Sequence, residues 1–283
     1  MKQPFLQDEA FLADVREAGR DPRQLSIWWL GQSGFLVQWR GHHALLDPYL
    51  TDSLTAKYAT TDKPHVRMTA RVIAPERLNF IDVVTSSHNH TDHLDAETLL
   101  ALSSVNARLQ LVIPEANRAF VSERLECPPD FPHGLDAGQS LSLTDLTFYG
   151  IPAAHNDLER DAAGRHKFLG YVIEIGPWRI YHSGDTRHYA GMEDWLRPFK
   201  VNVALLPING DRPERRVAGN LDGREAAQLA HAIGADVVIP CHYDMFEFNT
   251  ASPEEFVAEC QRLRQHYSVL QNGERWSAAK LGL

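Results

Sequence analysis

The sequence predicts an α/β (α+β) fold in which two stacked sheets carry helices on their outer faces. In each half of the chain, short apolar runs of strand length precede the helical segments, an order typical of this layering. The 283 residues include 43% hydrophobic and 23% charged side chains, the proportions of a globular protein. One large domain or two fused halves fit this length, but no repeat, low-complexity stretch or linker divides the chain. We therefore expect a single domain over residues 1–283.

The chain is expected to begin with a helical extension over residues 1–24. Its helix is predicted at 5–18, where one side carries Phe5, Phe11, Leu12 and Val15. Aromatic and β-branched runs then predict the strands of the first half, at 26–32, 35–40, 43–46, 80–86 and 109–113. The adjacent Trp28 and Trp29 are expected in the core, with one ring in each direction.

Helices in the first half are predicted at 95–103, with Asp95 as the N-cap, and at 114–126. Residues 51–75 have no clear period and are interpreted as a loop. The second half repeats the alternation, with strands expected at 142–149, 169–175, 179–183, 203–206 and 237–240. Its helices are expected from the cap Asp222 to residue 233, and at 252–265.

The overall charge excludes several classes of partner. With 28 Lys+Arg against 37 Asp+Glu the formal net charge is −9, which disfavours general binding of nucleic acid or anionic membranes. No apolar run approaches the roughly 18 residues of a membrane helix, and acidic residues near the N-terminus argue against a secretory signal. The three cysteines, Cys127, Cys241 and Cys260, are too few for a disulfide framework. A cytoplasmic protein is expected.

The 14 histidines are the unusual feature of the composition, and three of them lie in one short segment. His88, His90, Asp92 and His93 follow a predicted strand and precede a predicted helix. Imidazole nitrogen and carboxylate oxygen are ligands of zinc and similar divalent ions. In a turn, His88 and His90 can share one ion while Asp92 and His93 face a second. A lone His-x-His is often surface polarity, but the added Asp-His pair favours a metal site.

Three later residues complete such a site. His155, Asp185 and His242 each follow a predicted strand, and Gly184 permits a tight turn beside Asp185. Taken singly, each has an ordinary explanation as a strand cap or turn residue. Together they would supply a third nitrogen for the first ion, a carboxylate between the ions and a further nitrogen for the second.

This ligand series, in this order, resembles the metallo-β-lactamase superfamily of hydrolases. Residues 28–35 (WWLGQSGF), 47–50 (DPYL), 181–185 (YHSGD) and 239–244 (IPCHYD) are similar to its ascorbate-6-phosphate lactonase-like branch, and the resemblance spans residues 26–265. It implies a four-layer αβ/βα sandwich with a dinuclear site at one edge. By carry-over, His88, His90 and His155 would hold the first metal, Asp92, His93 and His242 the second, and Asp185 would bridge the two.

Two departures limit what the resemblance implies. The lactonases proper are longer than this chain, and their phosphate contacts have no match here, so the sugar-phosphate substrate does not carry over. The diiron oxidoreductases of the superfamily have a glutamate where this chain has His90, which favours hydrolysis over redox chemistry.

The predicted activity is a dinuclear metal-dependent hydrolase acting on a small ester or lactone. Two divalent ions per chain, with Zn²⁺ favoured and Mn²⁺ or Fe²⁺ as alternatives, would lower the pKa of a shared water and give a bridging hydroxide. Asp92 is the expected general base. Tyr243, beside a ligand, is a proton-donor candidate, although a buried aromatic residue fits that position equally well. A phosphodiesterase on the same scaffold and a non-catalytic metal-binding or regulatory protein remain alternatives.

Further residues near the motifs have two interpretations each. Asp47 ends a strand and is expected either to brace the histidine turn or to form a simple turn. His188 is placed near substrate or in solvent, and His182 and Cys241 are expected to be buried and not to bind metal. The groups Arg212, Arg215 and Arg216, and Lys57, Arg67 and Arg71, are either solvated or bind an anionic substrate. The expected partner is a small molecule, with a homo-oligomer left open.

Overall fold

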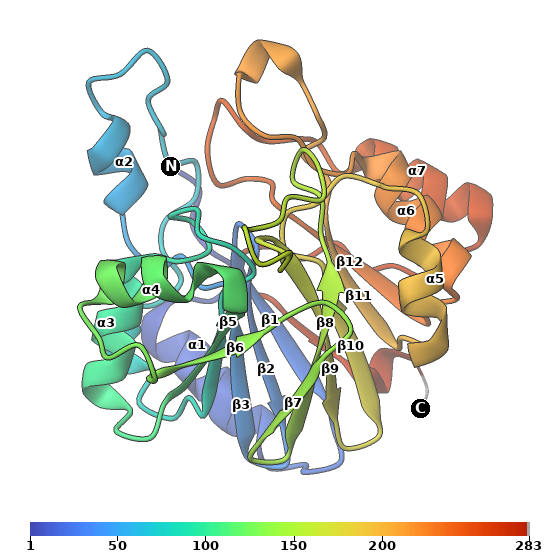
Figure 1. The fold of residues 1–283 in the computed structure, drawn as a ribbon. Coiled ribbons are helices and arrows are strands. Elements are labelled where there is room, and N and C mark those ends of the chain that lie inside the picture. The colour runs from blue at the N-terminus through green and yellow to red at the C-terminus, as the bar shows by residue number, and fades with distance from the viewer. Residues whose placement is uncertain (282–283) are drawn as a thin grey trace.

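The computed structural model describes residues 1–281 and shows two β-sheets packed face to face, with helices on both outer faces (Figure 1). This confirms the predicted α/β sandwich of two sheets and outer helices. Among the described residues, no helix is long and apolar enough to span a membrane.

The first sheet has the strand order β13-β1-β2-β3-β4-β5-β6. Its strands are β1 (Ser26–Gly31), β2 (Gly34–Trp39), β3 (His42–Leu46), β4 (Val83–Thr85), β5 (Gln110–Pro114), β6 (Pro132–Leu135) and β13 (Arg275–Ser277). The part formed by β13, β1, β2 and β3 is antiparallel, whereas β3, β4, β5 and β6 are parallel to one another. The strands β1, β3 and β4 therefore end at the same edge of the sheet.

The second sheet has the order β12-β11-β10-β9-β8-β7. Its strands are β7 (Ser140–Leu143), β8 (Leu146–Pro152), β9 (Leu169–Ile175), β10 (Trp178–His182), β11 (Val203–Pro207) and β12 (Val237–Cys241). The strands β10, β11 and β12 are parallel, and two antiparallel steps through β9 give β8 the same direction. The segments that follow β8, β10 and β12 are thus brought to one edge.

The helices cover the sheets in two groups. The helices α1 (Asp8–Ala18), α3 (Ala96–Val105) and α4 (Arg118–Leu125) lie against the first sheet, and α5 (Met192–Leu196), α6 (Gly223–Ile233) and α7 (Glu254–Leu263) against the second (Figure 1). The short helix α2 (Ser53–Tyr58) stands apart, above the edge where the site lies. Asp95 caps α3, and Asp222 forms a capping box with Glu225 at the start of α6.

The core divides at the first sheet. Trp29 and Phe35 belong to the cluster between the two sheets, while Trp28 packs on the opposite face against Phe11 of α1. Both indole rings are fully buried, and the Trp28 Nε1–H donates to Asp14. The expectation that these two neighbouring rings point in opposite directions is confirmed.

The structure corrects several predicted elements. The first helix begins at Asp8, so Phe5 lies before it and is 55% exposed instead of sharing its buried side. The predicted strand at 142–149 is the hairpin of β7 and β8, and Thr144 turns the chain with a φ of 52°. The predicted loop at 51–75 contains α2, and the strand predicted at 80–86 is shorter, Val83–Thr85. The strands β6 and β13 and the helix α5 were not predicted.

Candidate active site

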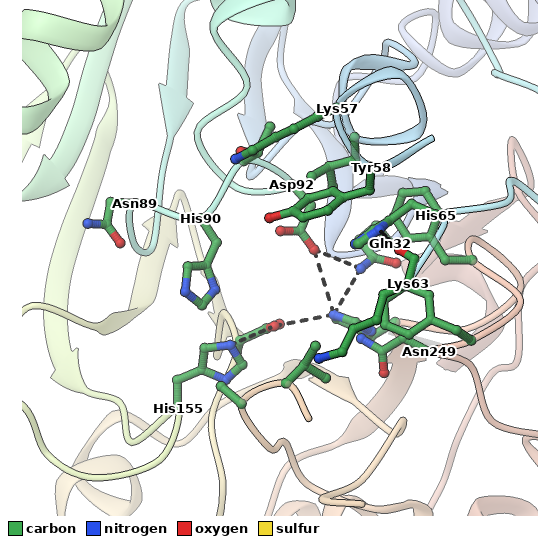
Figure 2. A pocket seen from close by; sticks show the side chains of 18 of the residues that line it. Gln32, Lys57, Tyr58, Lys63, His65, Asn89, His90, Asp92, His155 and Asn249 are labelled. Atoms are coloured by element: carbon green, nitrogen blue, oxygen red, sulfur yellow. Dashed lines mark hydrogen bonds and ion pairs between the residues drawn. The ribbon is translucent and has the colours of Figure 1, made fainter. Parts of the chain in front are cut away.

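The turn after β4 holds the first four candidate ligands. The Ser86 N–H donates to Val112 O and its hydroxyl to His88 O, while Leu94 N–H donates to His90 O at 2.8 Å. These bonds fold residues 86–94 into a compact turn that ends at the α3 cap. As a result His88 and His93 are buried, whereas His90 and Asp92 face a pocket (Figure 2).

Asp47 follows β3, is fully buried and stabilises this turn through hydrogen bonds. One carboxylate oxygen, Oδ2, lies 2.7 Å from His93 Nδ1, and Oδ1 accepts from the Ser87 N–H at 2.9 Å and the Thr85 hydroxyl at 3.1 Å. The Ser87 hydroxyl also donates to Asp47. Because Nδ1 of His93 is held in this way, Nε2 faces the other candidate ligands.

The remaining three ligands come from the ends of β8, β10 and β12. His155 Nε2 lies 3.6 Å and His242 Nε2 3.2 Å from Asp185 Oδ2, and His93 Nε2 lies 3.3 Å from Asp185 Oδ1. Gly184 has a φ of 58° and a Cβ there would come within 2.5 Å of Ser87, so the approach of the two turns requires glycine. Asp185 is thereby set between the histidines.

All seven residues predicted as metal ligands lie together. Their ligand atoms form three groups in which all atoms are within 4.8 Å of one another: His88 with His90 and His155, His88 with His93 and Asp185, and Asp92 with His93 and His242. Asp185 lies between the first and third groups. Each of these groups is a candidate position for a cation.

The donor atoms fit divalent ions. His88 Nε2 is buried and forms no hydrogen bond with any residue of the described chain. Buried polar atoms without a partner are rare in folded proteins, and an ion would satisfy this one. The opposite ring nitrogens are held, because His88 Nδ1 lies 3.0 Å from Ser87 Oγ and His155 Nδ1 3.0 Å from Gly219 O. Such bonds fix the orientation of metal-binding imidazoles.

The electrostatics keep most of these donors ready to bind a cation. Burial lowers the pKa of His88 well below 6.5 and that of His155 to about 4, so both rings are neutral at pH 7. Burial opposes ionisation of Asp185, but His242 and His93 lower the pKa of this carboxyl well below its usual range. Burial would also lower the pKa of His93, yet Asp185 and Asp92 outweigh it and raise that pKa well above 6.5.

Metal binding is therefore expected to release a proton from His93. Calorimetric titration of the metal-free protein at pH 7, in two buffers of different ionisation enthalpy, should detect about one proton per chain. Below the raised pKa of His93, the affinity for the second ion should fall about tenfold for each unit of pH, because one proton competes with the ion. Replacing the exposed His188 by Ala should change neither number. Proton-free binding at pH 7 would contradict this assignment.

The site opens into a pocket of about 640 Å³ (Figure 2). One wall is aromatic: the His65 ring stacks on Tyr58 at 4.3 Å and meets Phe248 at 4.5 Å and Phe246 at 5.1 Å. Four cations line the same pocket, Lys57, Lys63, Arg124 and Arg216. Lys63 Nζ donates to Arg216 O at 2.6 Å, and the Arg216 guanidinium pairs with Asp62. These two contacts connect the segment after α2 with the loop before α6.

Other residues singled out in the sequence lie away from the donors. The Tyr243 hydroxyl donates to Leu270 O and its ring packs on Trp29, so it is a buried aromatic residue and not aimed at the pocket. His188 is exposed and pairs with Glu193 at 2.8 Å. His182 Nε2 lies 2.9 Å from Ser33 O. Cys241 is a buried thiol.

The two groups of basic residues divide between structural and pocket-lining side chains. Arg67 pairs with Asp52, Arg71 donates to Leu50 O, and Arg215 donates to Asn209 O and Thr250 O. Only Lys57 and Arg216 of these groups line the pocket, and Arg212 is exposed.

Gln32 is the site residue that sequence reasoning missed. Its side chain is buried beside Asp92 and His242, although the sequence analysis identified it only as the last residue of the predicted strand at 26–32. A signal was available, since Gln32 follows β1, whose end lies at the same edge as those of β3 and β4.

Comparison with known proteins agrees with this geometry. Residues 42–243 match the family model of the β-lactamase superfamily domain. The chain is 28% identical over 246 residues to a UPF0173 metal-dependent hydrolase of Caldivirga maquilingensis, covering 85% of this chain and 92% of that protein. A UPF0173 metal-dependent hydrolase of Myxococcus xanthus is also 28% identical, over 259 residues, with 86% and 79% covered.

Solved structures share the fold. The metallo hydrolase Igni18 of Ignicoccus hospitalis superimposes with a TM-score of 0.65 at 22% identity, covering 90% of this chain and 98% of that one. The isothiocyanate hydrolase from Delia radicum gut bacteria gives a TM-score of 0.70 at 20% identity, with 89% and 100% covered. The narrower likeness to ascorbate-6-phosphate lactonases stays a prediction. With its matched domain, its two-sheet sandwich and its cluster of histidines and aspartates, the chain belongs to the β-lactamase superfamily and has the metallo-β-lactamase fold.

Proposed function

We propose that the protein is a metal-dependent hydrolase that holds two divalent ions and acts on a small ester or lactone. The observation that carries the proposal is the position of Asp185. Its Oδ2 faces His155 Nε2 at 3.6 Å and His242 Nε2 at 3.2 Å, so one carboxylate serves both groups of ligands. His88, His90 and His155 would hold one ion, and Asp92, His93 and His242 the other. Two ions held in this way would supply a hydroxide nucleophile at neutral pH.

Asp92 is the proposed general base. It lines the pocket, and its Oδ2 lies 2.8 Å from Gln32 Nε2. The other oxygen, Oδ1, forms no hydrogen bond within residues 1–281, so it is free to take a proton from the attacking water.

The lining of the pocket favours an anionic substrate with an apolar part. The exposed Lys57 ammonium has no carboxylate partner in residues 1–281 and lies 5.2 Å from the Tyr58 ring centroid. An anion bound there would sit beside the aromatic wall of Tyr58, His65, Phe246 and Phe248. The protein as a whole is acidic, with a net charge of −9. The Lys and Arg side chains at this pocket would therefore attract an anionic substrate locally, against the overall charge.

A substrate panel on metal-analysed protein tests the proposal. Chelator-free protein should contain about two ions per chain and hydrolyse lactones or carboxylic esters, with anionic esters preferred over neutral ones of the same shape. Lys57→Met should raise KM for the anionic ester about tenfold and leave the neutral ester unchanged, as expected for one lost charge contact of roughly 1.4 kcal/mol. Less than one tightly bound ion, or no turnover on the panel, would refute the proposal.

A phosphodiesterase is the second candidate. The cations Lys57, Lys63 and Arg216 at the pocket suit a phosphate group as well as a carboxylate. Including bis(p-nitrophenyl) phosphate in the same panel separates the two, since the ester hydrolase should turn over the lactone faster.

A further inference from the structure

We propose that Gln32 is a ligand of the second ion, through its side-chain oxygen. This inference rests on the proposed function only in that it uses the same pair of ions. It adds an oxygen donor from the turn between β1 and β2, far in the sequence from the histidine turn.

The distances place the Gln32 amide where a ligand of that ion would lie. Its Nε2 is 2.8 Å from Asp92 Oδ2 and 2.9 Å from His242 Nε2, and those two atoms are 3.9 Å apart (Figure 2). A separation of 3.9 Å lets one ion be held by both atoms. The end of the Gln32 amide is close to both of them, so it borders the space in which such an ion would lie.

The Gln32 side chain has one oxygen, Oε1, that can bind a cation. Gln32 is 1% exposed, and its Oε1 is buried without a hydrogen-bond partner among residues 1–281. Without an ion, the amide nitrogen donates to Asp92 Oδ2 and lies 2.9 Å from His242 Nε2. When Asp92 and His242 bind a cation, a half-turn of the terminal amide would bring Oε1 to the position that Nε2 held. Rotation about this last torsion is soft, so the exchange needs no movement of the backbone.

Backbone hydrogen bonds also hold Gln32 beside the proposed ligand His242. Its carbonyl oxygen accepts the His242 N–H at 2.9 Å and the Trp29 Nε1–H at 2.9 Å. Gln32 and His242 both have left-handed backbone conformations, with φ of 50° and 63°. Strained residues of this kind persist where surrounding contacts over-determine them, and they concentrate at functional sites.

The additional ligand would make the two ion positions chemically different. The first is rich in nitrogen, from His88, His90 and His155. The second would combine oxygens of Gln32, Asp92 and Asp185 with two imidazoles, a set that suits Mn²⁺ better than the first position does. We therefore expect Mn²⁺ to bind more tightly at the second position than at the first.

Three variants separate ligation from other roles of Gln32: Gln32→Met, which removes the oxygen; Gln32→Asn, which is one methylene shorter; and Gln32→Glu, which keeps an oxygen at the same reach. Metal-free protein is titrated with Mn²⁺ alone and free Mn²⁺ is counted by electron paramagnetic resonance. Wild type should bind two ions. The Met and Asn variants should lose about 10- to 100-fold in affinity for one ion and keep the other. The Glu variant should bind both at least as tightly as wild type.

The Glu variant decides the question. If Gln32 acts only as a donor to Asp92, Glu sets a second carboxylate against Asp92 and should bind the ion worse than Met does, which would overturn the proposal. Equal weakening of both ions in the Met and Asn variants, with a lowered melting temperature of the metal-free protein, would assign Gln32 a structural role and also overturn it. Wild type that binds fewer than two ions would instead refute the dinuclear centre, and this inference with it.

Discussion

Replacing Asp185 by Asn is expected to reduce kcat/KM on an ester or lactone substrate by about 10³-fold. The amide keeps the shape of the carboxylate but has only one oxygen with lone pairs for a cation. In the wild-type protein Oδ1 faces His93 Nε2 at 3.3 Å, while Oδ2 faces His155 and His242. Asn can therefore serve one ion position and not both. Steady-state kinetics together with metal analysis should find at most one tightly bound ion per chain.

A matched substitution controls for the loss of a negative charge. Asp211→Asn changes an exposed carboxylate paired with Arg187 at 3.5 Å, and should leave turnover and metal content unchanged. Folding is compared by thermal unfolding of both metal-free variants in chelator. Wild-type turnover in Asp185→Asn would show that this carboxylate does not join the two positions.

The directions of the strands explain why so much of the site could be predicted. A polar residue a few positions after an apolar run is visible in the sequence, and His155, Asp185 and His242 all have this signature. Parallel strands bring such ends to one edge, so the residues meet without any knowledge of their pairing. The strand at 169–175 was predicted with the bounds that the structure has, and Gly176-Pro177 mark its end in the sequence.

The elements that escaped prediction depend on contacts distant in the sequence. The strand β6 contains Pro132 and Gly134, which disfavour strands, and it forms because β5 pairs with it along its length. The hairpin of β7 and β8 turns at Thr144 with a positive φ, a conformation that sequence rules reserve for Gly, Asn and Asp. The strand β13 is too short to show a period and is defined by its pairing with β1.

Gln32 escaped for a related reason. Its position at the end of the predicted strand 26–32 is visible in the sequence. The direction of its side chain is set by the left-handed φ of Gln32 and by the hydrogen bond from the backbone of His242, 210 residues later. The sequence shows the position but not this direction.

Replacing Asp47 by Ala is expected to destabilise the protein by about 3–5 kcal/mol and to weaken metal binding about 10- to 100-fold. The carboxylate is fully buried and satisfies the Ser87 N–H, the Thr85 hydroxyl and His93 Nδ1 at once. Ala would leave these groups without partners in a dry interior, and the His93 ring would lose the bond that directs Nε2 to the ion.

The two effects need separate measurements. Urea unfolding in chelator gives the stability of the metal-free protein, and competition with a chelating dye gives the affinity for each ion. Asp145→Ala is the control, because its carboxylate is 74% exposed and pairs with His42 at 2.8 Å; it should cost less than about 1 kcal/mol and leave metal affinity unchanged. An Asp47→Ala protein as stable as this control, with both ions retained, would mean that the histidine turn is held without its carboxylate.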